Sequence, residues 1–198
     1  MAINTFLCIS SGPSLTVEDV EYSRKSLKNL TTIVVNDNYR ICPWAQHLYS
    51  ADTMWYKHHL EKIKKSEFSG TMWVPRGKDF AIQNGLNHIE CVYKPGLGKN
   101  GILHCGNHSG YQAINLAFHL GARRILLLGY DMCVEKNGNN HWFGKHPKGL
   151  RNQNNYEKWL HNYAALAKDL EKEEVEVINC SRTTKIKEFP RKTIQEIE

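Results

Sequence analysis

Residues 5 to 15 read Thr-Phe-Leu-Cys-Ile-Ser-Ser-Gly-Pro-Ser-Leu, an apolar run that passes at once into a turn. The run Thr5–Ser10 predicts a buried β-strand, because it is short, apolar and bounded by turn residues. Gly12 and Pro13 interrupt both strands and helices, so a tight loop must follow the strand directly. Thr16 then provides an N-cap for a helix that has acidic residues in its first turn. This is the sequence of a strand, a loop and a helix in succession.

The same alternation continues along the chain. Further strands are expected at Thr32–Asn36, His47–Ala51, Thr71–Val74, His88–Tyr93, Arg124–Leu128 and Val175–Asn179. Helices are expected at Thr53–Lys64 after an Asp52 cap, from a Ser109 cap to Gly121, and at Asn154–Glu173. The continuous apolar run Arg124–Leu128 is typical of a strand buried on both faces of a parallel sheet. Residues 1–198 are therefore expected to form a single Rossmann-like α/β domain, with a mostly parallel sheet and helices on both faces.

Composition narrows the class of protein. Hydrophobic residues make up 41% of the 198 residues and charged residues 23%, which excludes a collagen, a disordered tail and a coiled coil. The apolar run at the N-terminus is too short for a signal peptide or a membrane span, so a cytoplasmic protein without a membrane segment is expected. The six cysteines form no CxxC pair, which favours reduced thiols over a zinc site or a disulfide framework.

The formal charge of +6 is unevenly distributed. Between Lys94 and Arg151 there are eight basic residues and two acidic ones, and the rest of the chain is neutral. A solvated basic face would explain this excess, and so would a half of the molecule that binds an anion. The partner expected in the second case is a small phosphorylated ligand. Nucleic acid is disfavoured, because no nucleic-acid-binding motif accompanies the charge.

Polar residues follow the predicted strands, and ligands of parallel α/β sheets bind beyond the carboxyl ends of the strands. In the turn Ser11–Ser14, Gly12 permits close approach, and backbone amides with the Ser14 hydroxyl can face a phosphate. The turn is neither a GxGxxG fingerprint nor a P-loop. Asn36 and Asp131 follow two other strands. For residues of this kind, turn formation and capping are alternatives to ligand binding.

A second anion site is predicted at the start of the helix that Ser109 opens. His108, Ser109 and Gly110 place an imidazole, a hydroxyl and free amides at a positive helix end. Ser109 would equally serve as an N-cap alone.

Residues 132–153 are rich in Asn, Gly, His and Lys and are too long for a passive connection, which predicts a lid or active-site loop. His141 and His146 in this segment are candidate general bases, because an imidazole with a pKa near 6.5 accepts a proton at neutral pH. Lys145 and Lys148 are candidate ligands of a phosphate.

Three motifs together resemble the DUF115 group. They are Ser-Gly-Pro-Ser-Leu after the first strand, Asn36 after the second, and His-Ser-Gly110 opening a helix that leads to Leu-Gly-Ala-Arg-Arg-Ile-Leu-Leu-Leu-Gly-Tyr-Asp131. That group is related to sialyltransferases of glycosyltransferase family 42, to flagellin-modifying motility accessory factors and to archaeal 6-hydroxymethyl-dihydropterin pyrophosphokinases. The resemblance spans about residues 5 to 131 and is strongest to short single-domain members found in phages and prophages.

The resemblance implies a nucleotide-dependent transferase, most simply a glycosyltransferase that uses a nucleotide-activated sugar and a lid histidine as general base. It implies nucleotide contacts by Ser11, Gly12, Pro13, Ser14 and Asn36, with Ser109 and Gly110 beside the base or ribose. This sequence departs from the sialyltransferases at two positions, which leaves the identity of the donor undecided. Ser10-Ser11 stands where the sialyltransferases have Gly-Asn, and Cys133 stands near the position of one of their tyrosines.

The sequence leaves three other interpretations open. An ATP- and Mg²⁺-dependent pyrophosphokinase would use carboxylates such as Asp131 or Asp52. Asp131, His141 and His146 are candidate catalytic residues and could alternatively hold a metal ion, although their spacing matches no zinc motif and the favoured interpretation needs no metal. A non-catalytic nucleotide-binding protein is the third. A homo-oligomer is compatible with each of them.

Overall fold

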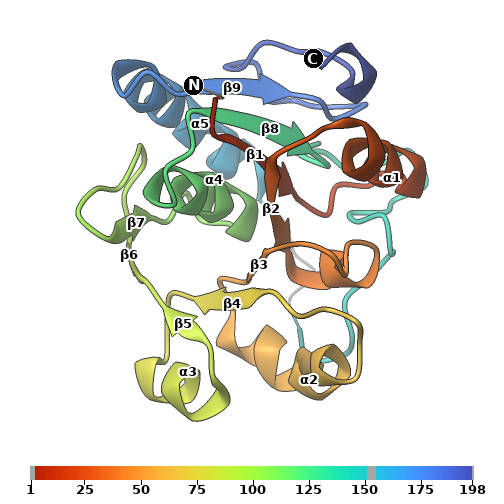
Figure 1. The fold of residues 1–198 in the computed structure, drawn as a ribbon, viewed down its shortest axis with the longest axis vertical. Coiled ribbons are helices and arrows are strands. Elements are labelled where there is room, and N and C mark those ends of the chain that lie inside the picture. Colours follow the sequence, from red (N-terminus) through yellow and green to blue (C-terminus); the bar gives the residue numbers. More distant parts are fainter. Residues whose placement is uncertain (1–2, 151–154, 198) are drawn as a thin grey trace.

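The computed structural model describes residues 3–150 and 155–197, which fold around one parallel sheet (Figure 1). Its seven strands lie in the order β5 (Asn87–His88), β4 (Thr71–Val74), β3 (His47–Tyr49), β2 (Leu30–Val35), β1 (Thr5–Ile9), β8 (Arg124–Leu128) and β9 (Glu176–Asn179). Every neighbouring pair is parallel. The predicted Rossmann-like α/β fold is confirmed.

Helices cover both faces of the sheet, because side chains along each strand point alternately to its two sides. Phe6 and Cys8 of β1 belong to a core shared with α4 (Ser109–His119) and α5 (Tyr156–Lys172). Leu7 and Ile9 belong to a second core shared with α1 (Val17–Ser26) and α2 (Thr53–Lys64). All four side chains are buried, which explains why β1 is apolar throughout.

The order of the strands creates a topological switch point, the place in the sheet from which successive connections lead to opposite sides. From β1 the chain builds β2, β3 and β4 outward on one side, and it later returns to place β8 on the other side of β1 (Figure 1). The connections after β1 and β8 therefore diverge at the carboxyl edge of the sheet. Such an edge is where doubly wound sheets bind ligands.

The helix caps agree with the sequence in two cases out of three. Thr16 Oγ1 accepts a hydrogen bond from Asp19 N at the start of α1, and Asp52 Oδ1 accepts one from Met54 N at the start of α2. The cap predicted for α4 is wrong. His108 is the N-cap, since its Nδ1 accepts a hydrogen bond from Tyr111 N at 3.3 Å, and Ser109 is the first helical residue.

The predicted strand His88–Tyr93 is also wrong, because it divides between two sheets. β5 forms the edge of the large sheet, and β6 (Glu90–Val92) pairs with β7 (Ile102–His104) in a separate parallel sheet of two strands. The division falls at Ile89, whose N–H still bonds to the end of β4 before the chain turns away. Four further short elements were not predicted: β7, α3 (Lys78–Asn84), the 3-10 helix η1 (Asn36–Arg40) and the 3-10 helix η2 (Ile194–Glu196).

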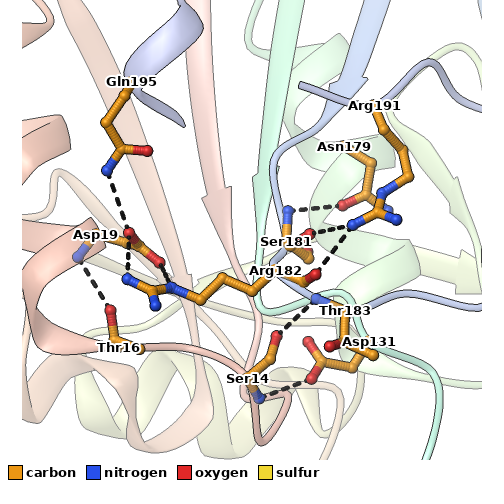
Figure 2. Close-up of polar contacts among 10 residues, drawn as sticks. All are labelled: Ser14, Thr16, Asp19, Asp131, Asn179, Ser181, Arg182, Thr183, Arg191 and Gln195. Atoms are coloured by element: carbon orange, nitrogen blue, oxygen red, sulfur yellow. Dashed lines mark hydrogen bonds and ion pairs between the residues drawn. The ribbon is translucent and has the colours of Figure 1, made fainter. Parts of the chain in front are cut away.

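The C-terminal residues after β9 return across α1. The Arg182 guanidinium bonds to both carboxylate oxygens of Asp19, at 2.7 and 3.1 Å, and Gln195 Nε2 lies 3.4 Å from the same carboxylate (Figure 2). Ile194 of η2 joins the core beneath α1. These contacts hold α1 against the sheet.

Among the helices of the described ranges, none combines the length and the apolar character needed to cross a membrane.

Candidate functional site

A cleft with a volume of about 280 Å³ opens at the switch point. It is bordered by the segments that follow β1, β2, β3 and β8, by the start of α4, by the start of α5, and by the chain between β8 and α5. Ten of the predicted site residues line it: Ser11, Gly12, Pro13, Asn36, His108, Ser109, Gly110, Asp131, His141 and His146. The parallel sheet brings Ser11, Asn36 and Asp131 together because its strands end at one edge.

The structure places Ser14, Lys145 and Lys148 away from the lining of this cleft. Lys145 lines a separate depression beside Arg40 and Lys62, and Lys148 is exposed without lining either hollow. Lys145 and His146 are neighbours in a segment without regular structure and face different sides of it. The role of phosphate ligand that was predicted for the two lysines therefore has no support in their positions.

The amides of the Gly-Pro-Ser loop are already used inside the protein. Gly12 N donates to Gly129 O at 2.8 Å, Ser14 N donates to Asp131 Oδ2 at 2.7 Å, and Leu15 N donates to Gly12 O at 3.1 Å. The Ser14 hydroxyl accepts a hydrogen bond from Thr183 N (Figure 2). The Gly12, Ser14 and Leu15 amides are therefore not available to a phosphate, contrary to the expectation for this loop, and a carboxylate holds the Ser14 amide.

Gly12 is required by close packing. A β-carbon at this position would overlap Asp131 Oδ1 and the carbonyl oxygen of Gly129. The loops after β1 and β8 thus touch across the switch point, and only glycine fits between them.

Two buried acceptors at the cleft have no hydrogen-bond donor among the described residues: Asp131 Oδ1 and Asn36 Oδ1. Burial raises the pKa of Asp131 to about 6, although the Ser14 amide and hydroxyl act in the opposite direction. Asn36 has a left-handed backbone with φ of 52°, which asparagine tolerates better than most residues. Because buried acceptors are normally satisfied, both oxygens indicate a partner that donates hydrogen bonds.

The start of α4 packs closely on the sheet. Ser109 Oγ accepts a hydrogen bond from Ala51 N at 3.1 Å, and the Gly110 carbonyl accepts one from Tyr130 OH at 2.9 Å. The two ring nitrogens of His108 contact Tyr111 N and the Tyr163 hydroxyl, the latter at 3.0 Å. Burial lowers the pKa of His108 to about 3, so the ring is neutral. Both ring nitrogens of His108 are thus engaged inside the protein and are not available to a ligand.

Aromatic side chains complete the lining. Trp159 of α5 stacks on His108 with ring centroids 5.2 Å apart, and Tyr156 and Trp55 also border the cleft. These three residues were not among the predicted site residues, since aromatic residues at helical spacing usually belong to a core. Their positions at the first turns of α2 and α5, beside the predicted strand ends, were the available signal.

The described part of the predicted lid, residues 132–150, lies against the cleft; residues 151–153 are outside the described ranges. Trp142 fixes it in place, because its backbone N–H donates to Ser11 O and its Nε1 donates to Asn38 Oδ1 at 2.7 Å. The rings of His141 and His146 lie 4.8 Å apart, and His141 stacks on Phe143.

Both lid imidazoles have lowered pKa values. Burial, with a contribution from His146, lowers the pKa of His141 to about 4, against a hydrogen bond to the Ser11 backbone. Burial also lowers the pKa of His146, whereas the charges of Asp37 and Asp52 oppose this change. Both rings are therefore neutral at pH 7 and able to accept a proton.

Asp37 is a buried carboxylate that was not among the predicted site residues. Its Oδ2 accepts a hydrogen bond from Trp55 Nε1 at 3.0 Å and lies 3.6 Å from His146 Nδ1. Its Oδ1 lies 3.7 Å from Arg40 and 3.9 Å from His59 Nδ1. The signal in the sequence was its position, one residue after Asn36 at the end of a strand.

Metal ligation receives no support from the arrangement of the side chains. Within residues 3–150 and 155–197, no group of three or more His, Cys, Asp or Glu residues is placed to hold a metal ion. In particular, Asp131, His141 and His146 do not form such a group.

A larger hollow of about 560 Å³ lies over the C-terminal segment. Its polar groups are largely committed to one another: Asp19 is bonded to Arg182, and Arg191 donates to the carbonyl oxygens of Ser181 and Arg182 (Figure 2). The smaller cleft at the switch point keeps unsatisfied acceptors and is therefore the better candidate site.

The fold and the cleft define a Rossmann-like α/β protein with a candidate ligand site at its topological switch point. No family model and no curated protein sequence matches the chain. Among solved structures, it is similar to the MAf glycosyltransferase from Magnetospirillum magneticum AMB-1, with a TM-score of 0.68 and 15% identity over 98% of this chain and 34% of that one. The chain thus spans about a third of the length of that protein. At this identity the likeness concerns the fold, and membership of the DUF115 group stays a prediction.

Proposed function

We propose that this protein is a nucleotide-dependent transferase, most simply a sialyltransferase-like glycosyltransferase that uses a nucleotide-activated sugar. The observation that carries the proposal is a pair of buried acceptors, Asn36 Oδ1 and Asp131 Oδ1, which lack a hydrogen-bond donor among the described residues and lie at the cleft at the switch point. Nucleosides and sugars carry the hydroxyl and amine donors that such acceptors bind. The likeness in fold to a glycosyltransferase supports the same class of protein.

The cleft offers a separate environment to each part of a nucleotide. The side chains of Trp159 and His108, both partly exposed, suit a base or a sugar ring. The first-turn amides of α4, at Ser109 and Gly110, suit a phosphate, because the N-terminus of a helix carries partial positive charge. The Gly-Pro-Ser loop, whose Ser14 amide is bonded to Asp131, forms a wall of the site in this arrangement.

The proposed reaction needs one proton acceptor and a stabilised leaving group. The hydroxyl oxygen of the acceptor attacks the anomeric carbon of the donor sugar, and the bond from that carbon to the phosphate oxygen breaks. Its electron pair leaves with the nucleotide beside the start of α4. The hydroxyl proton passes to a neutral imidazole of the lid, His141 or His146.

Release of nucleotide tests this function. The protein would be incubated with CMP-, UDP- and GDP-sugars and a mixture of glycan acceptors, and free nucleotide would be measured by chromatography. Wild-type protein and the Lys148→Ala control, altered outside the cleft, should release nucleotide, whereas a variant carrying His141→Gln and His146→Gln should be at least about 100-fold slower. Bound donor recovered intact from the wild type would contradict transfer and favour a non-catalytic nucleotide-binding protein.

A further inference from the structure

The Asp37 carboxylate has a fixed position beside the lid. Asp37 is only 3% exposed, and its Oδ2 is held by Trp55 Nε1 at 3.0 Å. Trp55 is itself held, because His59 stacks flat on it with ring centroids 4.3 Å apart and an interplanar angle of 10°. The Tyr39 hydroxyl lies 3.4 Å from His59 Nδ1, and the same nitrogen lies 3.9 Å from Asp37 Oδ1. The carboxylate therefore has little freedom to move away from its neighbours.

One of those neighbours is the imidazole of His146, whose Nδ1 lies 3.6 Å from Asp37 Oδ2. A neutral imidazole carries one proton, which can be on either nitrogen. A buried carboxylate oxygen is an acceptor, so it favours the tautomer in which the nearer nitrogen, Nδ1, is protonated. The lone pair is then on Nε2. Because His146 also lines the cleft, a base in this form borders the proposed nucleotide site.

The other lid histidine lacks this arrangement. His141 stacks on Phe143, and its ring is hydrogen-bonded to the backbone of Ser11. Its pKa of about 4 makes it a weak base, whereas the charges of Asp37 and Asp52 counteract the effect of burial on His146. Efficient general bases have pKa values nearer to the working pH.

We propose that Asp37 is the positioning residue for His146, and that His146 rather than His141 takes the proton of the acceptor hydroxyl. The catalytic part of this assignment rests on the proposed transferase function. The orientation of the ring does not, since it is argued from the position of the Asp37 carboxylate beside His146 Nδ1.

Long-range proton–nitrogen NMR of histidine-labelled protein tests the orientation without any substrate. The signal of His146 is assigned by its loss in His146→Gln. Wild-type protein near pH 7 should show His146 with Nδ1 protonated and Nε2 unprotonated. In Asp37→Asn this preference should be lost or reversed, and the pKa of His146 should fall because a carboxylate has been removed.

Asp52→Asn is the matched control. It removes the other carboxylate that acts on His146, while asparagine retains the capability to cap α2. The pKa of His146 should fall again, but its tautomer should stay the same. His146 protonated on Nε2 in the wild type, or a tautomer that Asp37→Asn leaves unchanged, would overturn the proposal. The wild-type spectrum decides even where the variant fails to fold.

Kinetics then separate positioning from a merely structural role. Asp37→Asn should lower kcat at least about 10-fold with little change in KM, and His146→Gln should lower it further, whereas His141→Gln should have a small effect. A larger loss in His141→Gln than in His146→Gln would overturn the assignment of the base. A wild-type protein that binds no nucleotide would contradict the proposed function and leave the tautomer result unaffected.

Discussion

Gly12 shows how closely the switch point is packed. Its place between Asp131 and the Gly129 carbonyl leaves no room for a β-carbon. We expect Gly12→Ala to lower the free energy of unfolding by about 1–3 kcal/mol, because the inserted methyl group must push the two loops apart. Urea denaturation measures this cost. Ser11→Ala is the control, since it adds no atom and removes only a 3.4 Å hydrogen bond to Val35 O; a Gly12→Ala protein as stable as this control would contradict the packing described.

Asp131 should make the stability depend on pH. Its pKa in the folded protein, about 6, is above the ordinary value of 3.8, so folding disfavours the charged form. The protein is then most stable, as far as this group is concerned, below pH 4, and it loses that stability as the pH rises through 6. For a pKa difference of this size the loss at pH 7 is about 3 kcal/mol.

Asp131→Asn removes the charge and keeps an oxygen that can accept from Ser14 N. The variant should be more stable than the wild type at pH 7, by up to about 3 kcal/mol, and the difference should shrink toward pH 4. Denaturation at both pH values measures it. A variant that is less stable at pH 7 would show that the ionised carboxylate is favourably paired in the folded protein.

At the scale of elements, the 132–150 segment is held to the sheet by a chain of hydrogen bonds. Asn38 Nδ2 donates to Ile9 O at the end of β1, and Asn38 Oδ1 accepts from Trp142 Nε1. Because Asn38 is completely buried, Trp142→Phe leaves its oxygen without this donor, which costs about 1–3 kcal/mol. Amide hydrogen exchange in residues 132–150 should become faster.

Trp44→Phe is the control for this prediction. The Trp44 Nε1 is buried and has no hydrogen-bond partner among the residues that the structure describes. Its removal should therefore leave hydrogen exchange in the 132–150 segment unchanged. Equal exchange in Trp142→Phe and Trp44→Phe would show that the bond to Asn38 does not hold the segment.

Long or strongly apolar elements were predictable from the sequence. The bounds of α2, β4 and β8 agree with the predicted ranges, since hydrophobic pattern and turn residues define them locally. The buried face of α2 depends on tertiary packing. Met54 is exposed and His59 is buried, because the helix packs Trp55 against the cluster around Asp37.

The candidate site could be predicted only as a set of strand ends. Parallel strands bring Ser11, Asn36 and Asp131 to one edge, whatever the side chains do there. The bond from Ser14 N to Asp131 and the contact between Asp37 and His146 join residues more than a hundred positions apart. Local pattern carries no information on such pairs. For the same reason, the sequence did not distinguish His146 from His141.

At the scale of the whole molecule, the C-terminal segment is fastened to α1 by a charged contact. Burial would raise the pKa of Asp19, but hydrogen bonds and the charge of Arg182 outweigh it, so the pKa is lowered from 3.8. The stabilisation is thus present above pH 4 and is lost as the pH falls through the lowered value. Asp19→Asn should destabilise the protein by about 1 kcal/mol at pH 7, because Arg182 is half exposed and stays hydrated.

Thermal unfolding at two pH values measures this contribution. The melting temperatures of Asp19→Asn and the wild type should differ at pH 7 and converge as the pH falls below 3.8 and through the lowered pKa of Asp19. A constant difference at both pH values would show that the loss comes from packing rather than from the charged contact.

The excess of basic residues between residues 94 and 151 is not gathered around the cleft in the part of the chain that the structure describes. Lys99 pairs with Glu173, and Arg124 pairs with Glu176. Both pairs lie near the amino ends of the strands, whereas the loop after β1 lies at their carboxyl ends. Lys145 lines a different depression. Lys99, Arg124 and Lys145 therefore lie away from the cleft, and the proposed recognition of a ligand there relies on hydrogen bonds and aromatic side chains.

Isothermal titration with CMP, UDP, GDP and ATP tests most directly whether this cleft is a nucleotide site. Asn36→Gly is the informative variant, since glycine accepts the left-handed backbone and removes only the side chain with the orphaned oxygen. Wild-type protein should bind at least one of the four nucleotides, and Asn36→Gly should bind it about 10-fold more weakly. Absence of binding to all four, or equal binding by wild type and Asn36→Gly, would contradict the assignment of the site.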